Sequence, residues 1–172
     1  MRSRQPKGPE IAADGFLELF LGHLSSDHGY SQQQIRSMLQ KEPIAKGISI
    51  PVPVFSVRKL GSFEALVKYL HEERRISLSQ IGRLTNRDPR TIWNVFHSSK
   101  RKHPEPLLVQ KSDVDVPLEI FSERKLSVLE SLVRYLHFTH GLGYSKIAQL
   151  LNRDPRTIHT VKTRAARKIN NG

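Results

Sequence analysis

Several features are missing from this 172-residue sequence. It contains no cysteine, which excludes a disulfide framework and thiolate ligands for zinc. No run of about 18 apolar residues is present, as a membrane-spanning helix would require. The basic start, MRSRQPKGPE, also lacks the apolar run of a secretion signal. We therefore expect a cytoplasmic protein that neither crosses nor binds a membrane.

The sequence also lacks the common motifs of catalysis. It has no phosphate-binding G-x-x-x-x-G-K-S/T loop, no H-E-x-x-H zinc motif and no G-x-S-x-G nucleophile motif. His137 and His140 are spaced by about one helical turn, but no nearby carboxylate or thiolate completes a set of metal ligands. We expect a protein that is not an enzyme and that needs no cofactor and no metal.

Acidic residues are scarce relative to basic ones. There are 28 lysines and arginines against 16 aspartates and glutamates, a net charge of +12. Residues 1–50 contribute +1, from six basic and five acidic side chains, so nearly all the excess lies beyond them. A basic surface attracts polyphosphate backbones. The charge therefore favours a nucleic-acid partner, although a merely soluble basic surface would show the same excess.

An internal repeat organises the last two-thirds of the chain. Residues 55–102 align with 121–168 without a gap, and 24 of the 48 positions are identical. The heptapeptide Asn-Arg-Asp-Pro-Arg-Thr-Ile recurs whole, at 86–92 and 152–158. The repeat predicts two copies of one fold. A fainter third copy at 15–43 is followed by Ile44-Ala45-Lys46-Gly47 and then by the extended Ile50-Pro51-Val52-Pro53-Val54, so we interpret it as a degenerate unit whose third helix is missing or vestigial.

Each repeat is typical of three short helices. In the first repeat Phe63, Leu66 and Leu70 follow helical spacing, and Glu64 stands three residues after an N-cap at Gly61. This position gives the glutamate, which recurs in the second repeat, a structural role rather than a catalytic one. The other caps are Ser77 with Gln80, Gly143, and an aspartate followed by a first-turn proline at Asp88-Pro89 and Asp154-Pro155.

These patterns predict an all-α protein of tandem tri-helical helix-turn-helix units joined by extended, proline-containing linkers. Two further segments, 51–55 and 117–121, are expected to be extended and to dock on a neighbouring unit. The expected segments are a flexible basic N-terminus (1–14), a degenerate helical unit (15–48), a first helix-turn-helix domain (49–103), a linker (104–116) and a second helix-turn-helix domain (117–172).

The third helix of each unit carries the candidate DNA-binding residues. In a helix-turn-helix the second helix of the motif enters the major groove with its N-terminal residues at the base edges. Arginine can bond guanine in bidentate fashion, asparagine can bond adenine, and threonine can offer its methyl group to thymine. The candidate base contacts are Arg90, Thr91, Trp93, Asn94 and His97 in the first unit, and Arg156, Thr157, His159, Thr160 and Thr163 in the second. The candidate phosphate contacts are Lys100, Arg101 and Lys102, with Arg164, Arg167 and Lys168.

Several of these residues have alternative roles. Trp93, the only tryptophan, would also suit packing under a neighbouring unit, although its counterpart is the polar His159. Arg87 and Arg153 are either phosphate contacts or solvated surface side chains. The basic clusters would also favour the C-terminal ends of their helices through the helix dipole.

Residues 144–158, followed by 164–169, resemble region 4 of bacterial sigma factors and related regulators, and residues 77–84 resemble it too. The resemblance implies a helix-turn-helix that binds a promoter element in the major groove, with contacts early in the third helix. Carried to this sequence, it supports Arg90, Trp93, Asn94, Arg156, His159 and Thr160. No segment resembles the family's promoter-melting region.

Together these observations predict sequence-specific binding of duplex DNA, by a nucleoid-associated transcription regulator or a DNA-targeting subunit of a complex. The two units imply adjacent sites in direct orientation unless the linker folds one unit back. One alternative is an interaction protein, in which residues 15–48 dock on RNA polymerase, another protein or a second copy of the chain. A second alternative is binding of structured RNA, which requires shape or stacking recognition.

Overall fold

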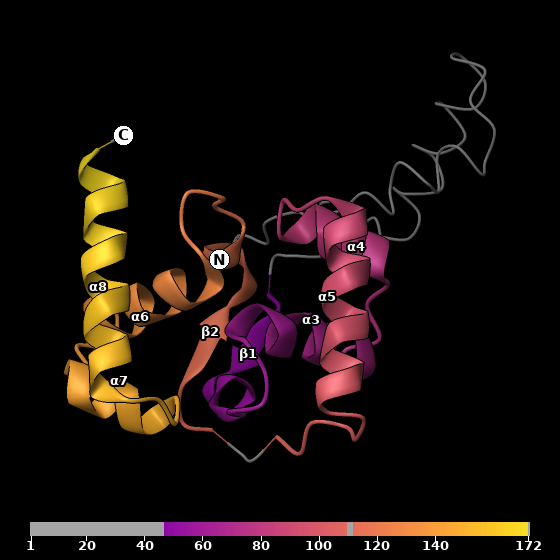
Figure 1. Cartoon of the computed structure of the whole chain (residues 1–172), viewed down its shortest axis with the longest axis horizontal. Coiled ribbons are helices and arrows are strands. Elements are labelled where there is room, and N and C mark those ends of the chain that lie inside the picture. The colour runs from indigo at the N-terminus through magenta and orange to yellow at the C-terminus, as the bar shows by residue number, and fades with distance from the viewer. Residues whose placement is uncertain (1–46, 110–111, 172) are drawn as a thin grey trace, which may run out of the picture. The chain divides into compact units, whose positions relative to one another are not determined.

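The computed structural model describes residues 47–109 and 112–171 (Figure 1). The expected flexible N-terminus, and all but the last two residues of the expected degenerate unit, lie outside the described residues. The described residues all belong to one compact unit, so both repeats are parts of a single body. Within the described residues, no helix has the length and apolar character needed to cross a membrane.

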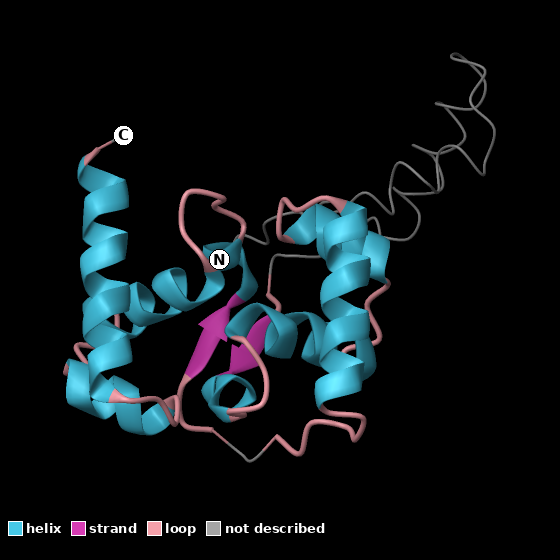
Figure 2. Cartoon of the chain, in the orientation of Figure 1, coloured by secondary structure: helices cyan, strands magenta, loops and turns pink. Residues whose placement is uncertain are grey.

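The two repeats contain the same elements in the same order (Figure 2). The first consists of strand β1 (Ser49–Pro51), 3-10 helix η1 (Val52–Ser56) and helices α3 (Ser62–Glu72), α4 (Leu78–Leu84) and α5 (Pro89–Lys102). The second consists of strand β2 (Asp115–Pro117), 3-10 helix η2 (Leu118–Phe121) and helices α6 (Val128–Phe138), α7 (Tyr144–Leu150) and α8 (Pro155–Asn170). The described residues are therefore mainly α, with six α-helices and one small two-stranded sheet.

The all-α expectation is thus correct only in its mainly helical character. The segments expected to be extended form a short strand followed by a 3-10 helix in each repeat, and the linker 104–116 ends inside β2. Both strands end at a proline, Pro51 or Pro117, whose fixed φ near −65° suits the entry to the 3-10 turn. The strands form because their backbone groups pair with each other, and the periodicity of such a short segment cannot reveal this pairing.

The helices begin at the predicted N-cap residues. The Glu64 carboxylate accepts a hydrogen bond from the backbone N–H of Gly61 at 2.9 Å, and the equivalent Glu130 accepts one from Ser127 at 2.7 Å. Asp88 accepts bonds from the backbone N–H groups of Arg90 and Thr91 at the start of α5. The structural role of the two glutamates and the aspartate caps of the third helices are therefore confirmed.

The turn between the second and third helices is the same in both repeats. Asn86 and Asn152 adopt the left-handed conformation, with φ of 51° and 50°, which asparagine tolerates better than most residues. The next N–H, of Arg87 or Arg153, then donates back to the carbonyl of Gly82 or Ala148 at 2.8 and 2.9 Å. This closed turn sets the angle between the two helices.

A single core joins the repeats. Strands β1 and β2 pair in antiparallel fashion, with Ile50 opposite Val116, and both side chains are fully buried. The rings of Phe55 and Phe121, which are also buried, lie 5.7 Å apart between their centroids. Apolar residues from all six helices belong to the same buried cluster or pack against it.

Candidate nucleic-acid interface

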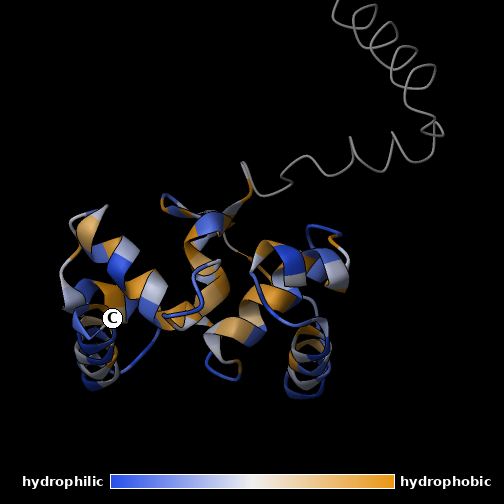
Figure 3. Ribbon diagram, turned by 90° about the horizontal axis from the view of Figure 1, so that it is seen from above, coloured by the Kyte–Doolittle hydropathy of each residue, from blue (hydrophilic) through white to orange (hydrophobic). Residues whose placement is uncertain are grey.

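Helices α5 and α8 hold the candidate base contacts on their outer faces. Each rests on the two preceding helices of its repeat, α3 and α4 or α6 and α7. The buried side of α8 consists of Ile158, Val161 and Ala165, and that of α5 begins with Ile92. Since these stripes face the core, the residues on the opposite side of each helix face outward. Figure 3 shows α5 and α8 nearly end-on, on the same side of the body.

In the first repeat all five candidate base contacts are exposed. Arg90, Thr91 and Asn94 lie free of the core on the outer face of α5. Trp93 is 52% exposed and stacks on His97, with 3.7 Å between the ring centroids. His97 Nδ1 also donates to the Trp93 carbonyl at 2.8 Å, which holds both rings in place. Within the described residues Trp93 therefore does not pack under the other repeat, and it presents a fixed aromatic surface instead.

In the second repeat the candidate base contacts form a smaller, more polar surface. Arg156, Thr157, His159 and Thr160 are exposed, whereas Thr163 is partly buried. The hydroxyl groups of Thr160 and Thr163 donate to backbone carbonyls one turn back, each at 3.0 Å. While these bonds persist, the two hydroxyl groups can only accept hydrogen bonds from a ligand, and the two side chains otherwise offer their methyl groups.

Three of the six candidate phosphate contacts are held by carboxylates of the first helices. Lys102 pairs with Glu64 at 2.8 Å, and the equivalent Lys168 pairs with Glu130 at 2.7 Å. Lys100 pairs with Glu72 at 3.1 Å. These lysines brace the third helix against the first helix of its repeat. Within the described residues no ion pair involves the other three cations, which are Arg101, Arg164 and Arg167.

The carboxylates of these pairs are charged at neutral pH. Burial alone would raise the pKa of Glu130, but hydrogen bonds from Lys168 and Ser127 outweigh it and bring the pKa below its ordinary value. Glu64 has a lowered pKa for the same reasons, with burial offset by bonds from Lys102 and the Gly61 backbone. The equivalent ion pair therefore persists in both repeats at neutral pH.

Arg87 and Arg153 connect the two repeats. The Arg153 guanidinium donates from Nη2 to the carbonyl of Leu60 at 2.8 Å, and Arg87 donates in the same way to Leu126 at 3.3 Å. Both side chains are partly buried, and within the described residues both Nε atoms are buried without a hydrogen-bond partner. Neither sequence-based interpretation, phosphate contact or solvated side chain, describes this bridging role.

Sequence reasoning missed a second pair of arginines, Arg58 and Arg124, at the same junction. Burial lowers the pKa of Arg153, and the positive charge of Arg58 lowers it further; Arg124 acts in the same way on Arg87. Arg58 and Arg153 line an open cavity of about 350 Å³ beside Pro155, the first residue of α8. Asp154 also lines this cavity, and its carboxylate already accepts a hydrogen bond from the N–H of Arg156 at the start of α8, so the two guanidinium groups and this carboxylate leave a net charge of +1 there. The unchanged Arg-Lys-Leu at 58–60 and 124–126 was the only sequence signal.

Histidines His71 and His137 have a structural role. Each donates from Nδ1 to the carbonyl of the residue five positions later, Ile76 or Leu142, at 2.9 Å. These bonds close the turn after the first helix of each repeat. Within the part of the chain that the structure describes, no group of three or more histidine or acidic side chains is placed to hold a metal ion.

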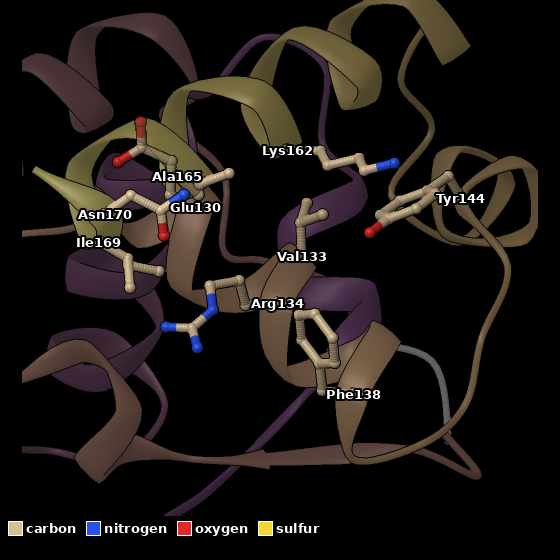
Figure 4. A pocket seen from close by; sticks show the side chains of 10 residues that line it. Glu130, Val133, Arg134, Phe138, Tyr144, Lys162, Ala165, Ile169 and Asn170 are labelled. Carbon is tan, nitrogen blue, oxygen red and sulfur yellow. The ribbon is translucent and has the colours of Figure 1, made fainter.

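The repeats differ behind their third helices. In the second repeat a cavity of about 260 Å³ lies between α6 and α8 (Figure 4). Its lining includes the exposed Phe138, and Lys162, whose amino group lies 4.6 Å from the centre of the Tyr144 ring. In the first repeat Phe96 occupies the position of Lys162 and packs on His71, with 4.5 Å between ring centroids. The two third helices are therefore braced differently on their inner sides.

Comparison of the chain with protein families, with curated proteins and with solved structures finds no match. The likeness to region 4 of sigma factors thus rests on the residues quoted for it alone.

Proposed function

We propose that this protein binds duplex DNA in a sequence-specific manner through α5 and α8, as a transcription regulator or as the DNA-targeting subunit of a complex. One observation carries the proposal. In both repeats the third helix buries its apolar stripe and leaves an arginine, a threonine and further hydrogen-bonding side chains exposed from its first turn onward. The resemblance to sigma-factor region 4 supports the same use of these helices.

The exposed side chains have the chemistry that base recognition needs. Arg90 and Arg156 occupy equivalent positions and each can donate two hydrogen bonds to a guanine. Asn94 can pair with an adenine, and the threonine methyl groups can contact thymine. Each good bidentate pair discriminates against the wrong base by about 1–3 kcal/mol. A helix of this kind would recognise only a few bases, so both helices are needed for a specific site.

Phosphate contacts would add affinity without specificity. Arg101, Arg164 and Arg167 continue the third helices, and Arg58 and Arg124 lie beside the turn that precedes the third helix of the other repeat. Neutralising phosphates releases counterions, so the dissociation constant should rise steeply with salt concentration.

The double variant Arg90→Ala, Arg156→Ala tests the proposal. In a selection of bound sequences from random duplex DNA, wild-type protein should enrich a defined site. The variant should enrich none, because the strongest bidentate contacts are lost from both helices. The variant Arg90→Lys, Arg156→Lys should also lose preference despite its unchanged charge, since lysine lacks the planar fork. A sequence preference that survives in the alanine variant would overturn the assignment of these helices.

The control variant Lys59→Ala, Lys125→Ala removes the same charge from outside α5 and α8. It should weaken binding to all sequences alike and keep the selected site. A competition between the selected DNA and duplex RNA of equal length checks the RNA alternative. Displacement by RNA at equal concentration would contradict recognition through the major groove of DNA.

A further inference from the structure

The two repeats are related by an approximate two-fold axis. Arg87 of the first repeat donates to Leu126 of the second, and Arg153 of the second donates to Leu60 of the first. Arg87 and Arg153 occupy equivalent positions in the aligned repeats, and so do Leu60 and Leu126. The contact is thus made twice, once in each direction.

The small sheet shows the same reciprocal pattern of contacts. Ile50 pairs with Val116, its own equivalent in the second repeat, so the axis passes between these two residues. Outside the paired residues, Val52 N–H donates to the Val114 carbonyl at 3.2 Å and Leu118 N–H donates to the Ile48 carbonyl at 2.9 Å. The two donors, Val52 and Leu118, occupy equivalent positions of the aligned repeats, and so do the two acceptors, Ile48 and Val114. The Phe55–Phe121 contact joins equivalent residues directly.

Reciprocal contacts distinguish a two-fold arrangement from a head-to-tail one. A two-fold junction brings the same surface of both partners together, whereas a head-to-tail junction joins two different surfaces. The repeats follow each other in the sequence, but the connection between them folds the second repeat back on the first. The two helix-turn-helix units are therefore inverted relative to each other rather than in direct orientation.

This symmetry places the two third helices as in a two-fold dimer. In Figure 1, α5 and α8 flank the small sheet and run in opposite directions. In Figure 3 both lie on one side of the body, so a single surface presents them together. Dimeric helix-turn-helix proteins present two equivalent helices in this way to successive major grooves on one face of DNA.

We propose that one chain binds an inverted repeat composed of two unlike half-sites, with α5 over one half-site and α8 over the other. The inference rests on the proposed DNA-binding function and specifies the class of site. The half-site centres are expected about 10 base pairs apart, or at a multiple of one helical turn. A single chain thus performs what other helix-turn-helix proteins achieve by dimerisation.

The half-sites are unlike because the outer faces of α5 and α8 are only partly equal. The first two candidate contacts are the same in both helices, an arginine and a threonine. The next three differ, since Trp93, Asn94 and His97 correspond to His159, Thr160 and Thr163. The half-sites should therefore share the bases beneath the common arginine and threonine and differ at the neighbouring bases.

A variant that makes the two outer faces equal gives the sharpest test. Trp93→His, Asn94→Thr, His97→Thr converts the α5 contacts to those of α8, at positions where the wild-type side chains are exposed. Selection from random duplexes should give a nearly perfect palindrome for this variant and an imperfect one for wild type. The reciprocal variant, His159→Trp, Thr160→Asn, Thr163→His, should give a palindrome of the other half-site. Circular dichroism checks that each variant keeps the wild-type melting temperature.

Spacing and stoichiometry test the same inference on wild-type protein. Adding about 5 base pairs between the half-sites turns them to opposite faces of the duplex, and affinity should fall by about 100-fold or more, to that of a single half-site. Native mass spectrometry should find one chain on each duplex. Two chains on each duplex, or affinity that does not depend on spacing, would overturn the proposal.

The outcomes separate this inference from the proposed function. Direct repeats or single half-sites, selected by wild type or by the equalised variants, would leave sequence-specific DNA binding intact and overturn the inverted arrangement. Failure of wild-type protein to enrich any duplex sequence would instead overturn the proposed function, and this inference with it. Palindromes from both equalised variants would support both.

Discussion

At the residue scale, one heptapeptide assigns two arginines to different tasks. Arg87 points into the junction between the repeats and donates to a carbonyl, whereas Arg90, three residues later, lies exposed on α5. Position relative to the N-cap decides which task each performs. Arg87 precedes Asp88 in the turn, and Arg90 belongs to the first turn of the helix, where side chains opposite the buried Ile92 face solvent. Identical side chains in the second repeat behave in the same way.

The ion pairs of Glu64 and Glu130 predict a loss of stability in acid. Both carboxyl groups have a pKa below the ordinary value of 4.5, so the unfolded chain binds protons more readily than the folded one. Their contribution is therefore present above that value and lost as pH falls through the folded-state pKa. The free energy of unfolding, measured with urea from about pH 7 down to about pH 3, should decline.

The double variant Glu64→Gln, Glu130→Gln isolates this effect. It should be less stable than wild type at neutral pH, because the ion pairs with Lys102 and Lys168 are lost. The difference in unfolding free energy between wild type and variant should shrink as pH falls, since glutamine does not titrate. A difference that stays constant across the pH range would contradict the lowered pKa values.

At the element scale, the helices are specified by local chemistry. Cap residues, first-turn prolines and apolar spacing act between near neighbours in the chain, so the sequence alone predicts where α3, α4 and α5 begin. The short strands and the 3-10 helices were not predictable in the same way. A strand as short as β1 exists because a partner strand supplies its hydrogen bonds, and that partner belongs to the other repeat.

The N-caps of the third helices should contribute measurable stability. Asp88→Ala removes the acceptor of two backbone N–H groups and should lower the free energy of unfolding by about 1 kcal/mol. Asp154→Ala should have a similar effect. Asp88→Asn is the matched control, because asparagine caps nearly as well. Urea unfolding measures all three, and an alanine variant as stable as the asparagine variant would refute the capping role.

At the scale of the whole molecule, the repeats share one core and should open together. Strand pairing, the Arg87 and Arg153 bonds and the Phe55–Phe121 contact all cross the junction. Native-state hydrogen exchange should therefore give the amides in the middle of α3 and of α6 the same opening free energy. Val116→Ala, which leaves a void at the junction, should lower both values by a similar amount. Continued protection of one repeat while the other exchanges would show independent domains.

Part of the candidate site was predictable and part was not. Several exposed positions on α5 and α8 follow from helical spacing, because a helix that buries Ile92 exposes Arg90 and Asn94 on its opposite side. The engagement of Lys102 and Lys168 by glutamates was not predictable, since each pair joins residues 38 positions apart. The same limitation applies to Arg58 and Arg124, whose neighbours belong to the other repeat.

The sequence by itself determined the repeat, the three helices of each copy, their caps and the outward residues of the third helices. These features depend on interactions between residues a few positions apart, and such interactions leave a local pattern. Only the tertiary structure decided that the repeats are inverted. The alignment of the two copies is equally compatible with a direct and a two-fold arrangement, and many of the contacts that separate them use backbone carbonyl and N–H groups, which nearly every residue carries.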